Sequence, residues 1–222
     1  MISFISISND VRIPENNDWV IILLLCCAFL YVFMMISLHR DASVKSFLQQ
    51  EFAESSNLFI SWVIVSLVTC LTLAALISQH IPIVPKAVSE LQILGLQLNK
   101  FGFTFLTLVL FYLCKAALSY LFFQSVGFSR RWPAFTFTAT RFYFVLSLFL
   151  MAACTGHYYF ITHKAEMLHI YVISFALVVI FKQFYYLFHK NQILPPEWYY
   201  KFLYICTLQI MPLLALWKLL FF

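Results

Sequence analysis

Two lysines within long apolar segments are the residues of this sequence best placed to bind a charged group. Lys115 and Lys182 lie roughly 10 to 13 Å inside the nearer ends of their predicted helices, at a rise of 1.5 Å per residue. Arg141 begins a third apolar segment at the same predicted membrane face. Intramembrane cations are costly and usually paired, yet none of the predicted spans contains an Asp or Glu. The spans themselves therefore supply no acid to pair with these cations.

Three interpretations of these cations stay open at the level of sequence. The long side chains snorkel to the membrane interface, or they bind an anionic lipid or a substrate phosphate, or a partner protein supplies the acid. Nearby tyrosines, among them Tyr120 and Tyr186, have hydroxyl groups that can donate to a phosphate. The residues predicted for an anion- or lipid-binding site are Lys115, Arg141, Lys182, Tyr112 and Tyr185.

Histidines are the second group with possible chemistry. His80, His157, His163 and His169 all map to the opposite membrane face, and Glu166 lies between the last two. Imidazole and carboxylate groups bind zinc, and paired histidines on separate helices hold haem. His163, Glu166 and His169 occupy positions i, i+3 and i+6, however, and these positions do not stay on one face of a helix. The sequence therefore predicts interfacial polar residues here, with no metal site and no cofactor.

Several enzyme templates are missing from the sequence. It contains no H-E-x-x-H, no G-x-S-x-G, no P-loop and no pair of intramembrane carboxylates. The six cysteines fall inside apolar segments without C-x-x-C spacing, which indicates small buried residues rather than a redox or zinc site. These features favour a non-enzymatic protein but leave enzymatic activity open.

The elements that must position these residues are six membrane-spanning helices. Of 222 residues, 63% are apolar and only 10% are charged, whereas a soluble domain carries roughly 25% charged residues. About 20 apolar residues cross the hydrocarbon core of a bilayer. The sequence predicts one all-α membrane domain, a bundle with spans at about Trp19 to Leu38, Leu58 to Ser78, Phe101 to Gln124, Phe142 to Ile161, Leu168 to Phe188, and Tyr199 to Phe221.

The distribution of basic residues predicts the orientation of this bundle. The side that contains both termini has five basic residues, Arg12, Lys86, Lys100, Lys164 and Lys218. The other side has eight, Arg40, Lys45, Arg130, Arg131, Arg141, Lys182, Lys190 and Lys201. Because an excess of Lys and Arg marks the cytoplasmic face, both termini are expected outside the cytoplasm.

A short amphipathic segment follows the first predicted span. Val44, Phe47, Leu48 and Phe52 recur at helical spacing, with charged residues opposite them. This pattern predicts a short helix on the cytoplasmic membrane surface. Asn57 is then expected to cap the second span. The segment after the second span, which includes Pro82 and Pro85, is expected to form an interfacial turn or a long lead-in to span three.

The last span has the most distinctive local sequence, FLYICTLQIMPLLALWKLL. Pro212 removes a backbone hydrogen bond, so a kink is expected. Thr207 and Gln209 are expected to satisfy the freed groups or to contact a neighbouring helix or a partner protein. Thr207, Gln209 and Pro212 are therefore predicted as helix-packing or partner-contact residues.

The run from Tyr204 to Leu213, together with the six-span layout, resembles an uncharacterised family of polytopic inner-membrane proteins of Gram-negative bacteria, a domain of unknown function. The resemblance covers most of the chain but depends chiefly on this last helix. It implies a location in the bacterial inner membrane and brings no catalytic residues. It also implies that the position of Gln209 is often a glutamate, from which this sequence departs.

Two functions are expected from these features. The first is an accessory or scaffolding subunit of a bacterial inner-membrane complex for envelope biogenesis or protein secretion, which fits a small protein without a catalytic constellation. The alternative is a lipid- or anion-binding transporter or transferase that uses the basic residues near the inner leaflet. The expected partners are the phospholipid bilayer, other membrane proteins and an anionic lipid; no nucleic acid is expected, because no soluble domain presents a basic surface.

Overall fold

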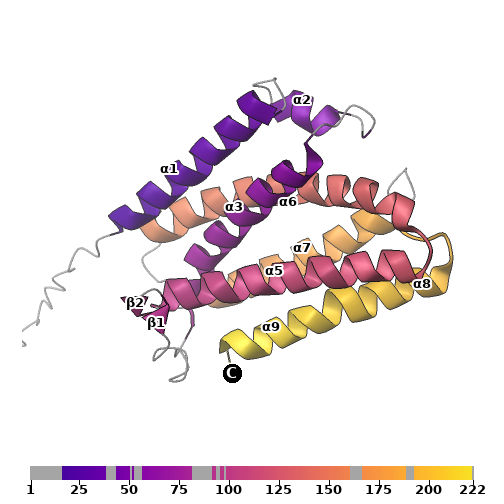
Figure 1. The fold of residues 1–222 in the computed structure, drawn as a ribbon. Coiled ribbons are helices and arrows are strands. Elements are labelled where there is room, and N and C mark those ends of the chain that lie inside the picture. The colour runs from indigo at the N-terminus through magenta and orange to yellow at the C-terminus, as the bar shows by residue number, and fades with distance from the viewer. Residues whose placement is uncertain are drawn as a thin grey trace, which may run out of the picture.

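The protein is a bundle of long helices. The computed structural model describes residues 17–38, 44–50, 52, 57–81, 92–93, 96–97, 99–160, 167–188 and 193–221. Six helices in these ranges are long and apolar enough to cross a membrane (Figure 1). The prediction of an all-α architecture with six such helices is confirmed.

The first three long helices begin and end close to the predicted positions. Helix α1 (Asp18–Phe33) continues into a π-helical turn, η1 (Met34–Leu38). Helix α3 (Leu58–Ser78) has the predicted bounds, and α5 (Lys100–Ser125) begins one residue earlier than expected. The side chain of Asn99 caps α5 by accepting a hydrogen bond from the backbone N–H of Gly102 at 2.8 Å.

The fourth long helix starts well before the predicted position near Phe142. After a 3₁₀ turn, η3 (Ser129–Arg131), helix α6 (Trp132–Thr155) begins and continues into a π-helical turn, η4 (Gly156–Phe160). Proline is favoured in the first turn of a helix, and Pro133 occupies that position here. The threonines of this first part lie within the helix, and their hydroxyl groups donate to the carbonyl four residues earlier. Arg141 therefore lies inside α6 and does not begin it.

The last two spans differ in regularity. Helix α7 (Met167–Leu187) is continuous. The final span has three parts: α8 (Trp198–Leu203), the π-helix η5 (Tyr204–Ile210) and α9 (Met211–Phe221). The irregular part lies immediately before Pro212, in the region where the sequence predicts a kink.

Three shorter features complete the described chain. A short helix, α2 (Val44–Gln49), is present where the amphipathic segment predicts one. Two two-residue strands, β1 (Gln92–Ile93) and β2 (Leu96–Gln97), pair antiparallel. The expected side-chain cap by Asn57 is wrong, because that side chain makes no capping hydrogen bond. Asn57 instead has a left-handed backbone, with φ of 58°, which asparagine tolerates better than most residues.

Several sequence-based predictions lie outside the described residues. These are the basic residues Arg12, Arg40, Lys86, Lys164 and Lys190, the loop with His163 and Glu166, and the segment with Pro82 and Pro85.

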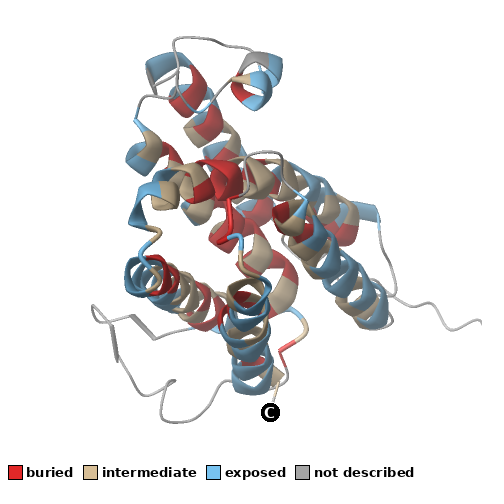
Figure 2. Ribbon diagram, turned by 90° about the vertical axis from the view of Figure 1, so that its right-hand side faces the viewer, coloured by how far each residue is buried: buried red, intermediate tan, exposed pale blue. Residues whose placement is uncertain are grey.

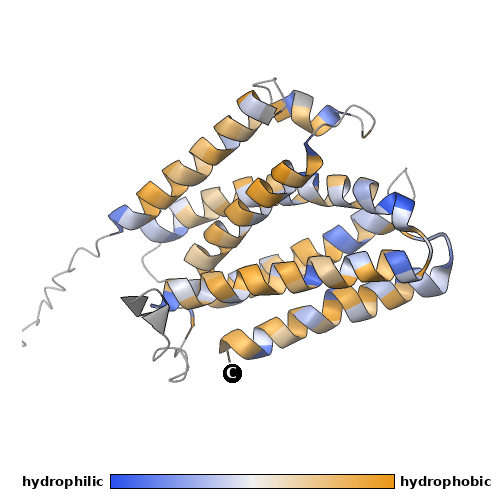
Figure 3. Ribbon diagram, viewed as in Figure 1, coloured by the Kyte–Doolittle hydropathy of each residue, from blue (hydrophilic) through white to orange (hydrophobic). Residues whose placement is uncertain are grey.

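Helices α3 and α6 pack together at the centre of the bundle, and the buried residues gather around them (Figure 2). Helix α1 lies against α3 on one edge, and α5 and α9 lie side by side on the opposite edge (Figure 1). One apolar cluster joins α1, α2, α3 and α6 and includes Tyr31, Phe47, Val68 and Phe144. The long helices are mainly apolar from end to end, with few hydrophilic positions (Figure 3). The fold therefore brings a small number of polar residues together inside an apolar bundle.

Candidate functional site

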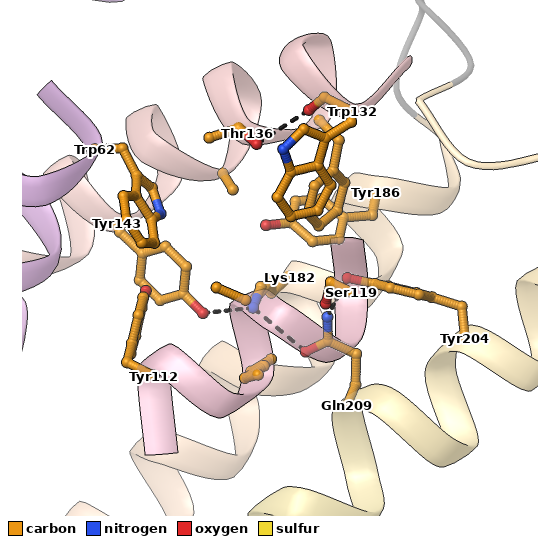
Figure 4. Close-up of a pocket in the computed structure, with 14 residues that line it drawn as sticks. Trp62, Tyr112, Ser119, Trp132, Thr136, Tyr143, Lys182, Tyr186, Tyr204 and Gln209 are labelled. Carbon is orange, nitrogen blue, oxygen red and sulfur yellow. Dashed lines mark hydrogen bonds between the residues drawn. The ribbon is translucent and has the colours of Figure 1, made fainter. Parts of the chain in front are cut away.

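A cavity of about 50 Å³ lies between five of the six long helical segments. Its residues come from α3, α5, α6, α7 and η5, and Figure 4 draws them as sticks. Its lining consists of Trp62, Tyr112, Lys115, Ala116, Ser119, Trp132, Phe135, Thr136, Ala139, Tyr143, Lys182, Tyr186, Tyr204 and Gln209. Two of these 14 described residues are basic and none is acidic. We call this cavity the basic pocket.

Lys182 is the best-defined cation of the basic pocket. Its side chain is only 6% exposed, and its ammonium group donates to the Tyr143 hydroxyl at 2.6 Å and to Gln209 Oε1 at 3.4 Å (Figure 4). The ammonium group also lies 4.7 Å from the centroid of the Tyr143 ring and 5.3 Å from that of Tyr186. Lys182 therefore does not snorkel to a surface, and neutral oxygens and aromatic faces hold its charge inside the bundle.

Lys115 contributes the second cation from α5. Its ammonium group lies 5.9 Å from the centroid of the Phe111 ring. The side chains of Lys115 and Lys182 line the same cavity. In a medium of low dielectric, two like charges that line one cavity repel each other strongly.

The π-helix η5 places two further polar residues at the basic pocket. Gln209 is 4% exposed, and its Nε2 donates to the hydroxyl of the fully buried Tyr204 at 2.8 Å. These residues are five apart, a spacing at which side chains of a regular α-helix point in different directions. A π-helix, whose backbone bonds join residues five apart, aligns them. The irregular geometry therefore directs the Gln209 carbonyl oxygen toward Lys182.

Three of the five residues predicted for anion binding line the basic pocket: Tyr112, Lys115 and Lys182. Arg141 and Tyr185 are not among its lining residues. The guanidinium group of Arg141 donates to the backbone carbonyl of Gln50 and lies 4.0 Å from the centroid of the Phe137 ring. Arg141 therefore joins α6 to the end of α2. The Tyr185 ring stacks on Phe142, at a centroid distance of 6.1 Å.

The three residues predicted to form helix contacts in the last span have different positions. Gln209 contacts Lys182 on α7 and is part of the basic pocket. Thr207 is exposed, and its hydroxyl donates to the Leu203 carbonyl at 2.6 Å. Pro212 is half-buried and follows η5 at the start of α9.

Sequence reasoning missed several residues of the basic pocket, chiefly Tyr143, Tyr204, Ser119 and Trp62. Ser119 shares a helix face with Tyr112 and Lys115 at spacings of three and four residues, so helical periodicity alone could have found it. No such signal links Tyr143 on α6 or Tyr204 on η5 to the lysines, because that proximity depends on how the helices pack.

The histidines form a second polar cluster away from the basic pocket. The ring centroids of His80 and His157 are 5.4 Å apart, and His157 Nδ1 lies 2.8 Å from the Tyr171 hydroxyl. His157 is fully buried, whereas His169 is exposed. Within the part of the chain that the structure describes, no group of three or more His, Cys, Asp or Glu could hold a metal ion. Among the described histidines, His80 and His157 pack together and His157 pairs with Tyr171.

The chain combines a multi-helix architecture compatible with a membrane and an interior basic pocket without an acidic lining residue. It belongs to the family described as Domain of unknown function (DUF4271), whose model matches residues 20–220. The match confirms that the sequence is a member of a domain-of-unknown-function family. The comparison with curated proteins found no match, and the comparison with solved structures found none either.

Proposed function

We propose that this protein is a multi-pass membrane protein that binds a phosphate-type anion in the basic pocket. The observation that carries the proposal is the convergence of Lys115 and Lys182 on one cavity whose described lining contains no Asp or Glu. An anion between the two ammonium groups would replace their repulsion with two attractions. The binding step serves transport or transfer of the anion across or within the membrane.

The donor set fits a phosphate better than it fits catalysis. Lysine ammonium and tyrosine hydroxyl groups donate hydrogen bonds to phosphate oxygens. Tyr143 and Gln209 accept hydrogen bonds from Lys182 with neutral oxygens, so neither cancels the ammonium charge. The Tyr112 hydroxyl is buried at the same cavity. The ligand is thus held by neutral donors and two cations.

We place the protein in the bacterial inner membrane with both termini outside the cytoplasm. The excess of basic residues near the end of α5 and the start of α6 supports this orientation. In this orientation the basic pocket lies in the cytoplasmic half of the bilayer. Anionic lipid headgroups are available to it from that leaflet.

The test is the binding of dihexanoyl phosphatidate to the full chain in a neutral detergent. This short-chain probe presents a phosphate from solution and from micelles alike. We expect the double variant Lys115→Met and Lys182→Met to bind it at least about tenfold more weakly, which corresponds to about 1.4 kcal/mol. Lys100→Met is the matched control, because Lys100 lies at the other end of α5 and does not line the basic pocket.

The double variant is expected to fold, because replacing buried charges by apolar groups is often neutral or stabilising. A size-exclusion profile and a thermal unfolding curve check this point. Unchanged phosphatidate binding in a folded double variant would overturn the proposal. If the double variant does not fold, Lys115→Gln alone provides the same comparison, because Lys115 is only half-buried.

A role as an accessory subunit is a second candidate, for which the outer face of α7 offers an apolar contact surface. Among the described residues of α7, only Lys182 and Tyr186 are buried. Ile173, Leu177, Phe181 and Phe184 are each more than half exposed and form an apolar surface. A partner helix would cover this face as lipid does. Gentle extraction from the native membrane, followed by quantitative mass spectrometry against an unrelated membrane protein, should then recover a stoichiometric partner; recovery of the solitary protein would contradict this role.

A further inference from the structure

The exposure of its lining residues shows on which side the basic pocket opens. On the α7 and η5 side the lining residues Lys182, Tyr186, Tyr204 and Gln209 are all buried. The half-buried lining residues belong to the other three helices: Trp62 from α3, Tyr112, Lys115 and Ala116 from α5, and Trp132, Thr136 and Tyr143 from α6. The described part of the basic pocket is therefore closed toward α7 and η5 and accessible between α5 and the α3–α6 pair.

The packing of α3 against α5 explains this opening. The contact between them uses the second half of α3, with Cys70 and Ala74, and the first half of α5, with Leu108. The first half of α3 packs instead in a different apolar cluster. In that cluster Val65 of α3 lies with Phe144 of α6. Helices α3 and α5 therefore converge at one end and diverge toward the end of α5 (Figure 1). The opening faces sideways out of the bundle, where a bilayer would place lipid.

The size and charge of the basic pocket restrict what can enter it. Since one ordered water needs roughly 10 to 15 Å³ of cavity space, a cavity of about 50 Å³ holds a few water-sized groups. This space suits one phosphate group and not a headgroup that carries a sugar. A phosphate monoester has a charge of about −1.5 to −2 near neutral pH and matches two ammonium groups, whereas a diester has a single charge.

The residues at the opening are compatible with a lipid. The indole rings of Trp62 and Trp132 prefer the headgroup level of a bilayer. Ala116, which is half-buried, has a small side chain at the opening. A glycerol backbone and acyl chains could therefore remain outside while the phosphate reaches Lys115 and Lys182.

We propose that the basic pocket takes the terminal phosphate of a lipid phosphomonoester of the phosphatidate type, which enters sideways between α5 and the α3–α6 pair. This inference rests on the anion-binding function proposed above and adds the class and route of the ligand. A larger side chain at Ala116 would obstruct the lipid at the opening without removing a charged or hydrogen-bonding group from the cavity.

The test measures lipid retention by native mass spectrometry on the full chain in neutral detergent. The probes are phosphatidate, phosphatidylglycerol and phosphatidylcholine with identical acyl chains, each alone and in competition with inorganic phosphate. We expect phosphatidate retention to exceed that of phosphatidylglycerol about tenfold and inorganic phosphate to displace little of it. Ala116→Leu should lower phosphatidate retention about fivefold. Its matched control is Ala117→Leu, because Ala117 is the exposed next residue of α5 and does not line the cavity.

The outcomes separate this inference from the function on which it rests. If the Lys115→Met and Lys182→Met double variant retains phosphatidate fully, the anion-binding function itself fails. If the double variant loses binding, but inorganic phosphate displaces phosphatidate at equal concentration and Ala116→Leu has no effect, the ligand is a free anion and the lipid inference is overturned. Equal retention of phosphatidylglycerol and phosphatidate would likewise contradict the preference for a monoester.

Discussion

At the scale of single residues, Gln209 is a buried hydrogen-bond partner of Lys182 in the basic pocket. Gln209 is neutral, so it accepts a hydrogen bond from Lys182 without cancelling the charge. Gln209→Glu would place a carboxylate at the same position and form a buried ion pair. We expect phosphatidate affinity to fall about tenfold in this variant, because the carboxylate competes with the phosphate for Lys182. Equilibrium binding of dihexanoyl phosphatidate measures the effect.

The control for this substitution is Gln124→Glu, which adds the same charge near the end of α5. Gln124 is exposed, and its side chain donates to the Tyr120 hydroxyl at 2.8 Å. It does not line the basic pocket. Equal affinities of Gln209→Glu and Gln124→Glu for phosphatidate would show that Lys182 does not contact the anion.

Tyr204 supports the site by accepting the hydrogen bond from Gln209 Nε2. Tyr204→Phe removes the acceptor while it preserves the ring that packs against Phe122 and Phe135. Leaving a buried donor without that acceptor costs about 1 to 2 kcal/mol, so the free energy of unfolding should fall by that amount. Denaturant unfolding in detergent measures the loss. Tyr199→Phe, at a residue that is 60% exposed, should cost much less, and an equal loss in both variants would contradict this role for Tyr204.

At the scale of elements, Arg141 has a different role from the two lysines. It connects α6 to the end of α2 through the Gln50 carbonyl, and its guanidinium carbon lies 6.0 Å from the centroid of the Phe47 ring. Arg141→Met removes a charge-assisted hydrogen bond, worth about 1.5 to 3 kcal/mol, and should loosen α2. We expect hydrogen exchange of backbone amides in residues 44–50 to accelerate about tenfold, with phosphatidate binding unchanged. A loss of phosphatidate binding as large as that of the lysine variants would instead identify Arg141 as a ligand residue.

The helices themselves were predictable from apolar length, but their irregular parts were not. The bounds of α3 follow directly from hydropathy. The early start of α6 was missed because threonine lowers hydropathy, although Pro133 is a helix-start signal. The π-helix η5 has no local sequence signature beyond Pro212 two residues after its end. Consequently Tyr204 and Gln209, which are five residues apart, could not be paired from the sequence.

At the scale of the whole molecule, the sequence indicated which residues are chemically unusual but not how they meet. The lack of acidic residues in the spans identified Lys115 and Lys182, and both line the basic pocket. Their proximity depends on the packing of α5, α6, α7 and η5, which periodicity within one helix does not specify. For the same reason Tyr143 was missed, although it is the nearest hydrogen-bond partner of Lys182 among the described residues.

The orientation of the molecule provides a prediction at this scale. If all six candidate helices span the membrane, both termini lie on one side, and the proposed orientation puts that side outside the cytoplasm because the other side has the excess of Lys and Arg. Alkaline phosphatase fused after the C-terminus should therefore be active, and the same enzyme fused after Arg130 should be inactive. Green fluorescent protein at the same two positions is the control and should give the opposite result. Fluorescence of the C-terminal fusion would contradict this orientation. It would indicate that the C-terminus is cytoplasmic and that the basic pocket lies in the outer leaflet.

The most direct measurement of the central claim is the proximity of phosphate to the two lysines in a bilayer. Solid-state NMR can detect dipolar coupling between ¹⁵N in lysine ammonium groups and ³¹P in phosphatidate or inorganic phosphate. We predict a coupling that corresponds to direct hydrogen bonding in the native protein and its loss in the Lys115→Met and Lys182→Met double variant. Coupling no stronger in the native protein than in the double variant would contradict anion binding in the basic pocket.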